Sequence, residues 1–413
     1  MTMTLIDATQ SDQTDPLRHF RDRFELPQGV IYLDGNSLGA LPKTVKARVA
    51  RTISEEWGEQ LIRSWNTAGW VHLPQQVGGK IGRLIGAQDG CVVAADSTSI
   101  NLFKVLSAAL SLNPDRTGIV SERENFPTDL YIAQGVAKQI GQGHQLALAG
   151  KPGDIPAMLT SDVAVLMLTH VNYRTGYRHD MAAITKAAHD KGILVIWDLA
   201  HSAGAMAIDL AGADADFAIG CGYKYLNGGP GAPAFLYVNP RHHGGFRQPL
   251  SGWFGHRAPF EFEAAYAPSN GIEQYLCGTP QVLGLVAMDE ALALWEDVDM
   301  AALRAKSVAL CDFFIQEVEV FADEFGLKLV TPRNAEQRGS QVSYSCDNGY
   351  AIMQALIARG VIGDFRAPDI IRFGFTPLYL SFAEVSGAVT ILRDILATRS
   401  WDAPEYKVRG AVT

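Results

Sequence analysis

The sequence is poor in cysteine and has no long apolar run. Its 413 residues include five cysteines, which are widely spaced and never form Cys-x-x-Cys. This spacing argues against a disulfide framework and against a cysteine-based zinc site, so we expect reduced and mostly buried thiols. Apolar runs such as residues 163–168 fall far short of a membrane span. We therefore expect a chain that does not enter a membrane.

The sequence also lacks basic clusters and the motifs of several common sites. Its net charge is −9 without a Lys/Arg block, which argues against binding to nucleic acid or to an anionic membrane. No GxGxxG follows the first predicted strand and no GxxxxGK[ST] occurs, so a nicotinamide or ATP site is disfavoured. His242 and His243 are adjacent and no HExxH is present, so we predict no metal. The N-terminus lacks a basic segment followed by an apolar core, which favours a cytoplasmic protein.

The apolar pattern predicts an α/β fold. Short β-rich runs alternate with stretches of helical periodicity, which is typical of a mostly parallel sheet covered by helices. The runs are residues 91–94, 117–120, 163–168, 193–197, 217–219 and 234–238. From about residue 283 a long helical pattern leads into a C-terminal α+β stretch. We expect a large domain over residues 46–282, a small domain over residues 283–413, and an N-terminal segment, residues 1–45, that packs with the small domain.

Two polar residues stand where open α/β sheets bind ligands, beyond the carboxyl ends of the strands. Asp198 ends the apolar run ILVIWD, and Lys224 lies in CGYKYLNGGPG, just after the next predicted strand, FAIG. Pyridoxal phosphate (PLP) needs a lysine that forms an imine with its aldehyde and a carboxylate that keeps its pyridine nitrogen protonated. Taken singly, Asp198 is better explained as a helix cap and Lys224 as a solvated loop charge. Together, and next to a glycine-rich turn, they favour a PLP site.

The segment ADSTSINLFKVL predicts an anion site at the start of a helix. It places Ser97, Thr98 and Ser99 just before a stretch of helical periodicity. The free N–H groups and the dipole of a helix N-terminus attract an anion such as a phosphate. Since Ser and Thr at a helix start serve more often as simple caps, this segment supports a phosphate site only together with Asp198 and Lys224.

Six motifs, in the same order along the chain, resemble the kynureninase family. They are LDGNSLGA, NFPTDLY, DLAHSAG, GYKYLNGGPG, LSGWFGH and IRFGFTPLY, and the resemblance extends from about Val30 to the C-terminus. It implies the fold-type I architecture of PLP-dependent enzymes, aminotransferase class V-like, and an obligate homodimer with active sites at the subunit interface. It also implies hydrolytic cleavage of L-kynurenine to anthranilate and L-alanine, in tryptophan degradation and in the supply of NAD biosynthesis.

The resemblance assigns cofactor roles to residues along the chain. It makes Lys224 the Schiff-base lysine, Asp198 the partner of the pyridinium nitrogen, and Tyr223 a phosphate ligand and a candidate for proton transfer. The other residues implied to contact PLP are the phosphate ligands Thr98 and Ser99, the stacking ring of Phe126, and Asp129, Thr169 and His201. Trp253 and Thr279 are implied to contribute to the cofactor site across the dimer interface. Lys224, once displaced by the substrate amine, is expected to remove the α-proton.

The resemblance also implies how the substrate is held. Arg372, in IRFGFTPLY, corresponds to the arginine that grips the α-carboxylate, and its planar fork suits that task better than a lysine. Ser37, Trp65 and Phe254 resemble substrate-pocket positions. Thr279 and Trp65 are the residues expected of bacterial members, whereas vertebrate members that favour the 3-hydroxylated substrate carry Asn and His there. This favours unsubstituted kynurenine as the substrate.

Two alternatives remain open at this point. A cysteine desulfurase would need an activated cysteine on a mobile loop, and only Cys346, in SYSCDNG, qualifies by position. The pair Tyr223-Lys224 argues against it, because resemblance to desulfurases would require His-Lys. A PLP-binding regulator without turnover would usually append a DNA-binding module, for which the short acidic N-terminus leaves no room.

Overall fold

The computed structural model describes residues 5–244 and 248–410, which separate into two compact units. The larger unit comprises Thr44–Asn172 and His179–Glu296. The smaller unit comprises the N-terminal segment to Lys43, the short stretch Tyr173–Arg178, and the chain from Asp297 onward. The predicted domain bounds, 1–45, 46–282 and 283–413, stay a prediction.

A seven-stranded sheet forms the centre of the larger unit. Its strand order is β4 (Val92–Ala94), β10 (Phe235–Val238), β9 (Phe217–Gly220), β8 (Leu194–Asp198), β7 (Val163–Thr169), β5 (Gly118–Glu122) and β6 (Gln145–Ala149). The strands from β9 to β6 are parallel, whereas β10 is antiparallel to both β9 and β4. Two reversals cancel, so β4 runs in the same direction as the parallel strands.

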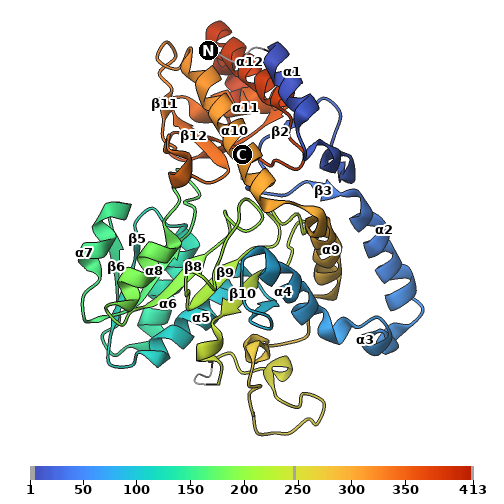
Figure 1. Ribbon diagram of the computed structural model, residues 1–413, viewed down its shortest axis with the longest axis vertical. Coiled ribbons are helices and arrows are strands. Elements are labelled where there is room, and N and C mark those ends of the chain that lie inside the picture. The colour runs from blue at the N-terminus through green and yellow to red at the C-terminus, as the bar shows by residue number, and fades with distance from the viewer. Residues whose placement is uncertain (1–4, 245–247, 411–413) are drawn as a thin grey trace. The chain divides into compact units, whose positions relative to one another are not determined.

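Helices cover this sheet, as Figure 1 shows for α5, α6 and α8. The helices of the larger unit include α4 (Leu73–Leu84), α5 (Thr98–Leu112), α6 (Pro127–Ile140), α7 (Ile155–Met158), α8 (Met181–His189) and α9 (Val282–Leu292), with the shorter α3 (Ser64–Thr67) and α2 (Lys43–Arg51) before them. Helix α5 packs on β7, β8, β9 and β10 through a buried apolar face that includes Leu102, Val105 and Leu106. Burial of this face, at about 25 cal/mol per Å² of apolar surface, anchors α5 and therefore its N-terminus.

The predicted α/β class is confirmed, and all six predicted strands are present within one or two residues. The sequence pattern missed β6, QLALA, at the edge of the sheet. Its residues alternate between exposed and half-buried up to Ala149, and it contains no β-branched residue. A half-solvated edge strand of this composition resembles a helix as much as a strand in its sequence.

The smaller unit is an antiparallel sheet with helices on it. The sheet order is β11 (Lys328–Leu329), β12 (Gln341–Ser345), β15 (Ile370–Gly374) and β14 (Asp364–Arg366). The helices are α10 (Met300–Glu319), α11 (Gly349–Ala358), α12 (Phe382–Thr398) and α1 (Leu5–Thr14), and short pairs join β1 (Phe24–Glu25) to β3 (Leu41–Pro42) and β2 (Ile31–Tyr32) to β13 (Val361–Ile362). Ser381 and Glu384 form a capping box that begins α12.

The five cysteines are free thiols, four of them buried and Cys277 half-buried, as predicted. Along the described ranges, every helix is too short or too polar to cross a bilayer.

Candidate active site

Most of the predicted cofactor residues of the larger unit lie at or just after one edge of its sheet. The carboxyl ends of β4, β5, β7, β8 and β9 lie at this edge because the five strands run in the same direction. Thr169 and Asp198, the last residues of β7 and β8, are register partners, and Asp198 is also paired with Ile219 of β9. The remaining residues follow these strand ends directly: Thr98, Ser99, Phe126, Asp129, His201, Tyr223 and Lys224.

Lys224 lies on a tight loop after β9 and contacts His201. Its Nζ is 2.9 Å from Nε2 of His201 and 5.7 Å from the ring centroid of Tyr223. The loop closes on itself, since the N–H of Asn227 donates to the Lys224 carbonyl at 2.9 Å and that of Gly228 to the Gly222 carbonyl at 2.9 Å. A Cβ on Gly222 would lie 2.5 Å from a backbone oxygen, so this turn requires glycine. The sequence thus holds a half-buried amine at a defined place.

Asp198 is a buried carboxylate whose charge is opposed by its surroundings. It is 6% exposed, and its Oδ1 accepts a hydrogen bond from the N–H of Ala200 at 2.8 Å. Burial raises the pKa of Asp198, while the positive charge of Lys224 and the Ala200 N–H act to lower it. A cationic partner at this position would therefore be strongly stabilised.

Asp129, in the first turn of α6, is a second buried carboxylate at the same edge. It is 2% exposed, and burial and the charge of Asp198 raise its pKa, against the influence of Lys224 and a hydrogen bond from Asn125. In the part of the chain that the structure describes, its Oδ2 has no hydrogen-bond partner. A buried carboxylate oxygen without a donor is costly, so this oxygen is suited to a donor from a bound molecule.

The N-terminus of α5, where an anion site is predicted, follows β4 at the same edge of the sheet. Ser97 caps the helix, with its Oγ 3.4 Å from the N–H of Ile100, which leaves Thr98 and Ser99 in the first turn. The preceding Asp96 adopts a left-handed conformation with a φ of 49° and pairs with Lys104, at 2.6 Å from Oδ2 to Nζ. Lys104 is fully buried and also donates to the carbonyl of Tyr275. The strained turn before α5 is thus tied to a buried cation within the helix itself.

Trp65, Trp253 and Phe254 form an aromatic cluster of their own. The ring centroids of Trp65 and Phe254 are 5.9 Å apart, and those of Trp253 and Phe254 are 4.8 Å apart. Trp253 and Phe254 lie in a short 3-10 helix, Trp253–Gly255, after β10 in the chain. Trp253 and Thr279 are exposed in the single chain.

In the smaller unit, the structure brings together Arg372 and Ser37. Arg372 lies on β15, is 1% exposed, and donates from Nη2 to Oγ of Ser37 at 2.7 Å and from Nη1 to the carbonyl of Tyr173 at 2.6 Å. Its Nη2 also pairs with Asp364 of β14, the register partner of Arg372, and lies 3.9 Å from Oδ1 of Asp34. The predicted carboxylate-binding arginine thus stands between two acidic residues.

Three charged residues near the predicted sites were not identified from the sequence: Asp34, Asp364 and Lys104. Asp34 stands within LDGNSLGA, three residues before Ser37, and Asp364 lies opposite Arg372 in the hairpin DFRAPDIIRFG. A hairpin alignment of that stretch would have paired Asp364 with Arg372. Lys104 carried no signal, because a lysine within an apolar helical pattern is usually a solvated residue.

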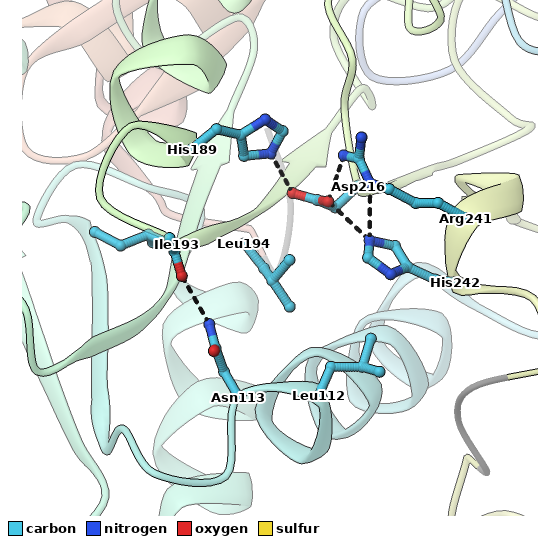
Figure 2. A pocket seen from close by; sticks show the side chains of 9 residues that line it. Leu112, Asn113, His189, Ile193, Leu194, Asp216, Arg241 and His242 are labelled. Carbon is cyan, nitrogen blue, oxygen red and sulfur yellow. Dashed lines mark hydrogen bonds and ion pairs between the residues drawn. The ribbon is translucent and has the colours of Figure 1, made fainter.

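A second polar cluster lies at the opposite edge of the sheet, before β8 and β9 (Figure 2). Asp216 is buried there and binds Nε2 of His189 at 2.7 Å, Nε2 of His242 at 2.8 Å and Nη2 of Arg241 at 2.6 Å. These groups line a cavity of about 340 Å³. The polar side chains of this cluster bind one another through ion pairs and hydrogen bonds. Among the described residues, no set of three or more His, Cys, Asp or Glu side chains is arranged to hold a metal. We assign this cluster to stability.

Comparison with known proteins decides the family. A family model described as the kynureninase C-terminal domain matches residues 303–392. A protein named kynureninase from Burkholderia pseudomallei (strain 1106a) is 55% identical over 411 residues, which cover 98% of this chain and 99% of that protein. The chain belongs to the kynureninase family.

Solved structures share the fold of this kynureninase-family chain. The apo structure of a cysteine desulfurase from Thermococcus onnurineus NA1 has a TM-score of 0.78 at 19% identity, over 92% of this chain and 98% of that one. A C-DES variant with glycine covalently linked to its PLP cofactor also has a TM-score of 0.78, at 17% identity, over 91% of this chain and 99% of that one. At these identities the likeness shows the fold alone, which is that of fold-type I PLP-dependent enzymes.

Proposed function

We propose that this chain hydrolyses L-kynurenine between Cβ and Cγ to give anthranilate and L-alanine, with PLP bound at Lys224. The observation that carries the proposal is the contact between Lys224 and His201 beside the buried Asp198, at the carboxyl edge of the sheet. Membership of the kynureninase family along nearly the whole chain supports the substrate and the reaction. The proposed context is tryptophan degradation and the supply of NAD biosynthesis, in the cytoplasm.

The residues present fit the cofactor. A protonated pyridine nitrogen is the cationic partner that the buried Asp198 is suited to, and the Oδ2 of Asp129 can accept a further donor from the cofactor or its surroundings. Thr98, Ser99 and the first N–H groups of α5 suit the phosphate. Phe126, at the start of α6 and 41% exposed, offers a ring face for stacking. Thr169, beside Asp198 in the sheet, completes the proposed cofactor set.

When bound, PLP supplies an electron sink for the carbanion formed at the substrate Cα. Lys224 would hold the cofactor covalently through its Nζ, and the same Nζ, when free, would accept the α-proton of the substrate. His201 orients that Nζ through their 2.9 Å contact. Tyr223, with its ring 5.7 Å from Nζ, is the proposed partner in proton transfer to the leaving carbon. Overall, water adds across the Cβ–Cγ bond: hydroxide goes to the acyl carbon of anthranilate and a proton to Cβ of alanine.

Arg372 is the proposed ligand of the substrate α-carboxylate, with Ser37 beside it. A buried guanidinium offers paired N–H donors in one plane, which matches a carboxylate. Trp65 and Phe254 are proposed to line the pocket for the aminophenyl ring, for which their mutual contact at 5.9 Å provides an apolar wall. Trp65 and Thr279 support unsubstituted kynurenine as the preferred substrate.

We further propose a homodimer in which Trp253 and Thr279 serve the site of the other subunit. In the single chain, large apolar side chains are exposed over residues 53–62 and 253–262, and a groove of about 410 Å³ is lined by Trp57, Trp70 and residues 280–284. The exposed side chains are Ile53, Trp57, Leu61, Ile62, Trp253, Phe260, Phe262 and Leu283. An apolar surface of this kind is typical of a subunit interface. Sedimentation of the purified protein tests the dimer, and a monomer at micromolar concentration would exclude it.

The fold also occurs in cysteine desulfurases, so Cys346 must be considered. Its thiol is 6% exposed, and burial raises its pKa to about 12. A desulfurase nucleophile needs an accessible thiolate. Cys346 therefore lacks the properties of such a nucleophile.

Fluorescence of released anthranilate provides the test of the proposed function. The purified protein, supplied with PLP, is expected to turn L-kynurenine into anthranilate and L-alanine in equal amounts, and to release no sulfide from L-cysteine. Bound PLP without any anthranilate would favour a regulator, and sulfide release would favour a desulfurase.

A further inference from the structure

More negative charge surrounds Arg372 than one arginine neutralises. Asp364 pairs with Nη2 of Arg372, and its side chain is only 5% exposed. Asp34 faces the same Nη2 at 3.9 Å, with a side chain that is 17% exposed. The remaining charge is Arg366, whose Nη2 lies 2.5 Å from Asp364 but whose side chain is 35% exposed. Two carboxylates therefore share a largely buried space with one buried cation.

The backbone holds Asp34 in this position. The carbonyl of Leu33 accepts the N–H of Gly374, two residues after Arg372, at 2.7 Å, and the N–H of Leu33 donates to Ile362 at 2.7 Å. After Asp34 the chain turns, because the N–H groups of Ser37 and Leu38 both donate to the Asp34 carbonyl, at 2.9 and 3.1 Å. Asp34 thus stays near Arg372 as long as the two backbone segments remain paired.

The neighbours of Asp34 disfavour its charge. Burial and the charge of Asp364 raise the pKa of Asp34 to about 7, against the lowering influence of Arg372, a hydrogen bond from Ser37, and Arg366. Two tyrosines are further titratable neighbours. Burial, Asp34 and Asp364 raise the pKa of Tyr32, and burial, with Tyr32 and Asp34 among the charges, raises the pKa of Tyr379, so both phenols stay neutral near pH 7. Asp34 is therefore the group near Arg372 that changes charge in the neutral range.

We propose that Asp34 controls the attraction of Arg372 for the substrate carboxylate, and that it takes up a proton when the carboxylate binds. The proposal rests on the proposed role of Arg372. With Asp34 neutral, the two arginines exceed Asp364 by one positive charge, which a substrate carboxylate compensates. With Asp34 ionised, the charges already cancel, and an arriving carboxylate meets two like charges in a poorly hydrated space.

The consequence is a substrate affinity that falls as the pH rises. If only the form with neutral Asp34 binds well, the KM for L-kynurenine should increase roughly tenfold between pH 6 and pH 8, by proton linkage at a group with a pKa of about 7. Asp34→Asn keeps the neutral form at every pH. Its KM should equal that of the wild type at pH 6 and lie about tenfold below it at pH 8.

Kynuramine, which is kynurenine without its carboxylate, separates Asp34 from other titrating groups. It carries the same amine and aryl ketone, so titration of Lys224, Tyr223 or the amine affects both molecules. As a competitive inhibitor, kynuramine should show the same inhibition constants in the wild type and in Asp34→Asn over the whole pH range.

Calorimetry of L-alanine binding in two buffers of different ionisation enthalpy should show proton uptake at pH 8 in the wild type that is absent from Asp34→Asn.

Parallel KM profiles of the two proteins between pH 6 and pH 8 would overturn the inference. If Asp34→Asn fails to fold, the wild type alone decides: a ratio of the kynurenine KM to the kynuramine inhibition constant that stays constant over this range overturns the inference, and a tenfold rise supports it. The proposed function fails differently, through absence of anthranilate at every pH, so the two failures are distinguishable.

Discussion

Nζ of Lys224 lies 2.9 Å from Nε2 of His201. The two residues come from the loops after neighbouring parallel strands, β9 and β8, so the contact depends on the register that pairs Asp198 with Ile219. A lysine held in this way loses little conformational freedom when it forms a covalent bond at a fixed place. The contact thus connects the order of strands in the sheet with the chemistry proposed for its edge.

Replacement of Lys224 tests the covalent link. Lys224→Ala should lose both anthranilate release and the cofactor that borohydride fixes to the chain, because no other lysine is proposed to form the Schiff base. Peptide mass spectrometry after reduction should locate the cofactor on Lys224 in the wild type. Lys191→Ala, which removes an exposed lysine, is the matched control and should behave as the wild type. Full turnover by Lys224→Ala would refute the assignment.

Lys104 should influence the cofactor through its phosphate. Lys104→Met removes the buried cation that holds Asp96 before α5, so the first turn that carries Thr98 and Ser99 should lose its geometry. We expect the affinity for PLP to fall about tenfold or more, as for loss of a hydrogen bond to a charged group, and the affinity for pyridoxal, which has no phosphate, to change little. Reconstitution of the apoprotein, followed by absorbance, measures both.

The control for Lys104→Met is Lys138→Met, which removes an exposed lysine from α6. Equal losses of affinity for PLP and pyridoxal in Lys104→Met would indicate general damage to the fold and would contradict a role at the phosphate.

The strands and the chemical groups at their ends could be predicted from sequence, because each is a local feature. Apolar runs predicted β7 and β8, and the carboxylate that terminates the second run marked Asp198, whereas Thr169 was assigned only through the family resemblance. The start of α5 could also be predicted from local sequence, because the capping residue, Ser97, directly precedes the helix. These features need no knowledge of what lies next to them in space.

Contacts between distant segments could not be predicted. Asp34 and Arg372 are joined only because residue 33 pairs with residue 374, and nothing in either local sequence indicates that pairing. The direction of β10, antiparallel within a parallel sheet, was also hidden, because an apolar run has the same pattern in both directions. Trp253 and Thr279 are proposed to serve the active site of a second chain, and the sequence of one chain gives even less information about contacts between chains.

Arg372 should act on binding of the substrate carboxylate. Arg372→Lys keeps the charge but loses the planar fork, so the KM for L-kynurenine should rise by about tenfold or more while kcat changes less. Arg372→Ala should raise the KM further and also lower the melting temperature, because the buried Asp364 then keeps only Arg366, whose side chain is 35% exposed, as its cationic partner. Unchanged KM values for kynurenine, together with an unchanged inhibition constant for L-alanine, would remove Arg372 from the substrate site.

The Asp216 cluster should stabilise the larger unit without affecting catalysis. Hydrogen bonds from His189, His242, the Val195 N–H and Arg241 hold the pKa of Asp216 far below its usual range, in spite of burial. Asp216→Asn should therefore lower the free energy of unfolding by about 3 kcal/mol at neutral pH, as expected when a buried charge pair loses one partner. Kinetic constants of the folded variant should match those of the wild type.

The direction of the pKa shift of Asp216 determines how the stability lost in Asp216→Asn depends on pH. A carboxylate whose pKa is depressed in the folded state contributes stability above its unfolded pKa, near 3.8, and loses that contribution as the pH falls toward the folded value. The difference in melting temperature between wild type and Asp216→Asn should thus be constant above about pH 5 and shrink below pH 4. Asp214→Asn, in the same cluster but with a side chain that is 60% exposed, should cost less than about 1 kcal/mol. Equal losses of unfolding free energy in Asp216→Asn and Asp214→Asn would show that burial does not cause the larger contribution of Asp216.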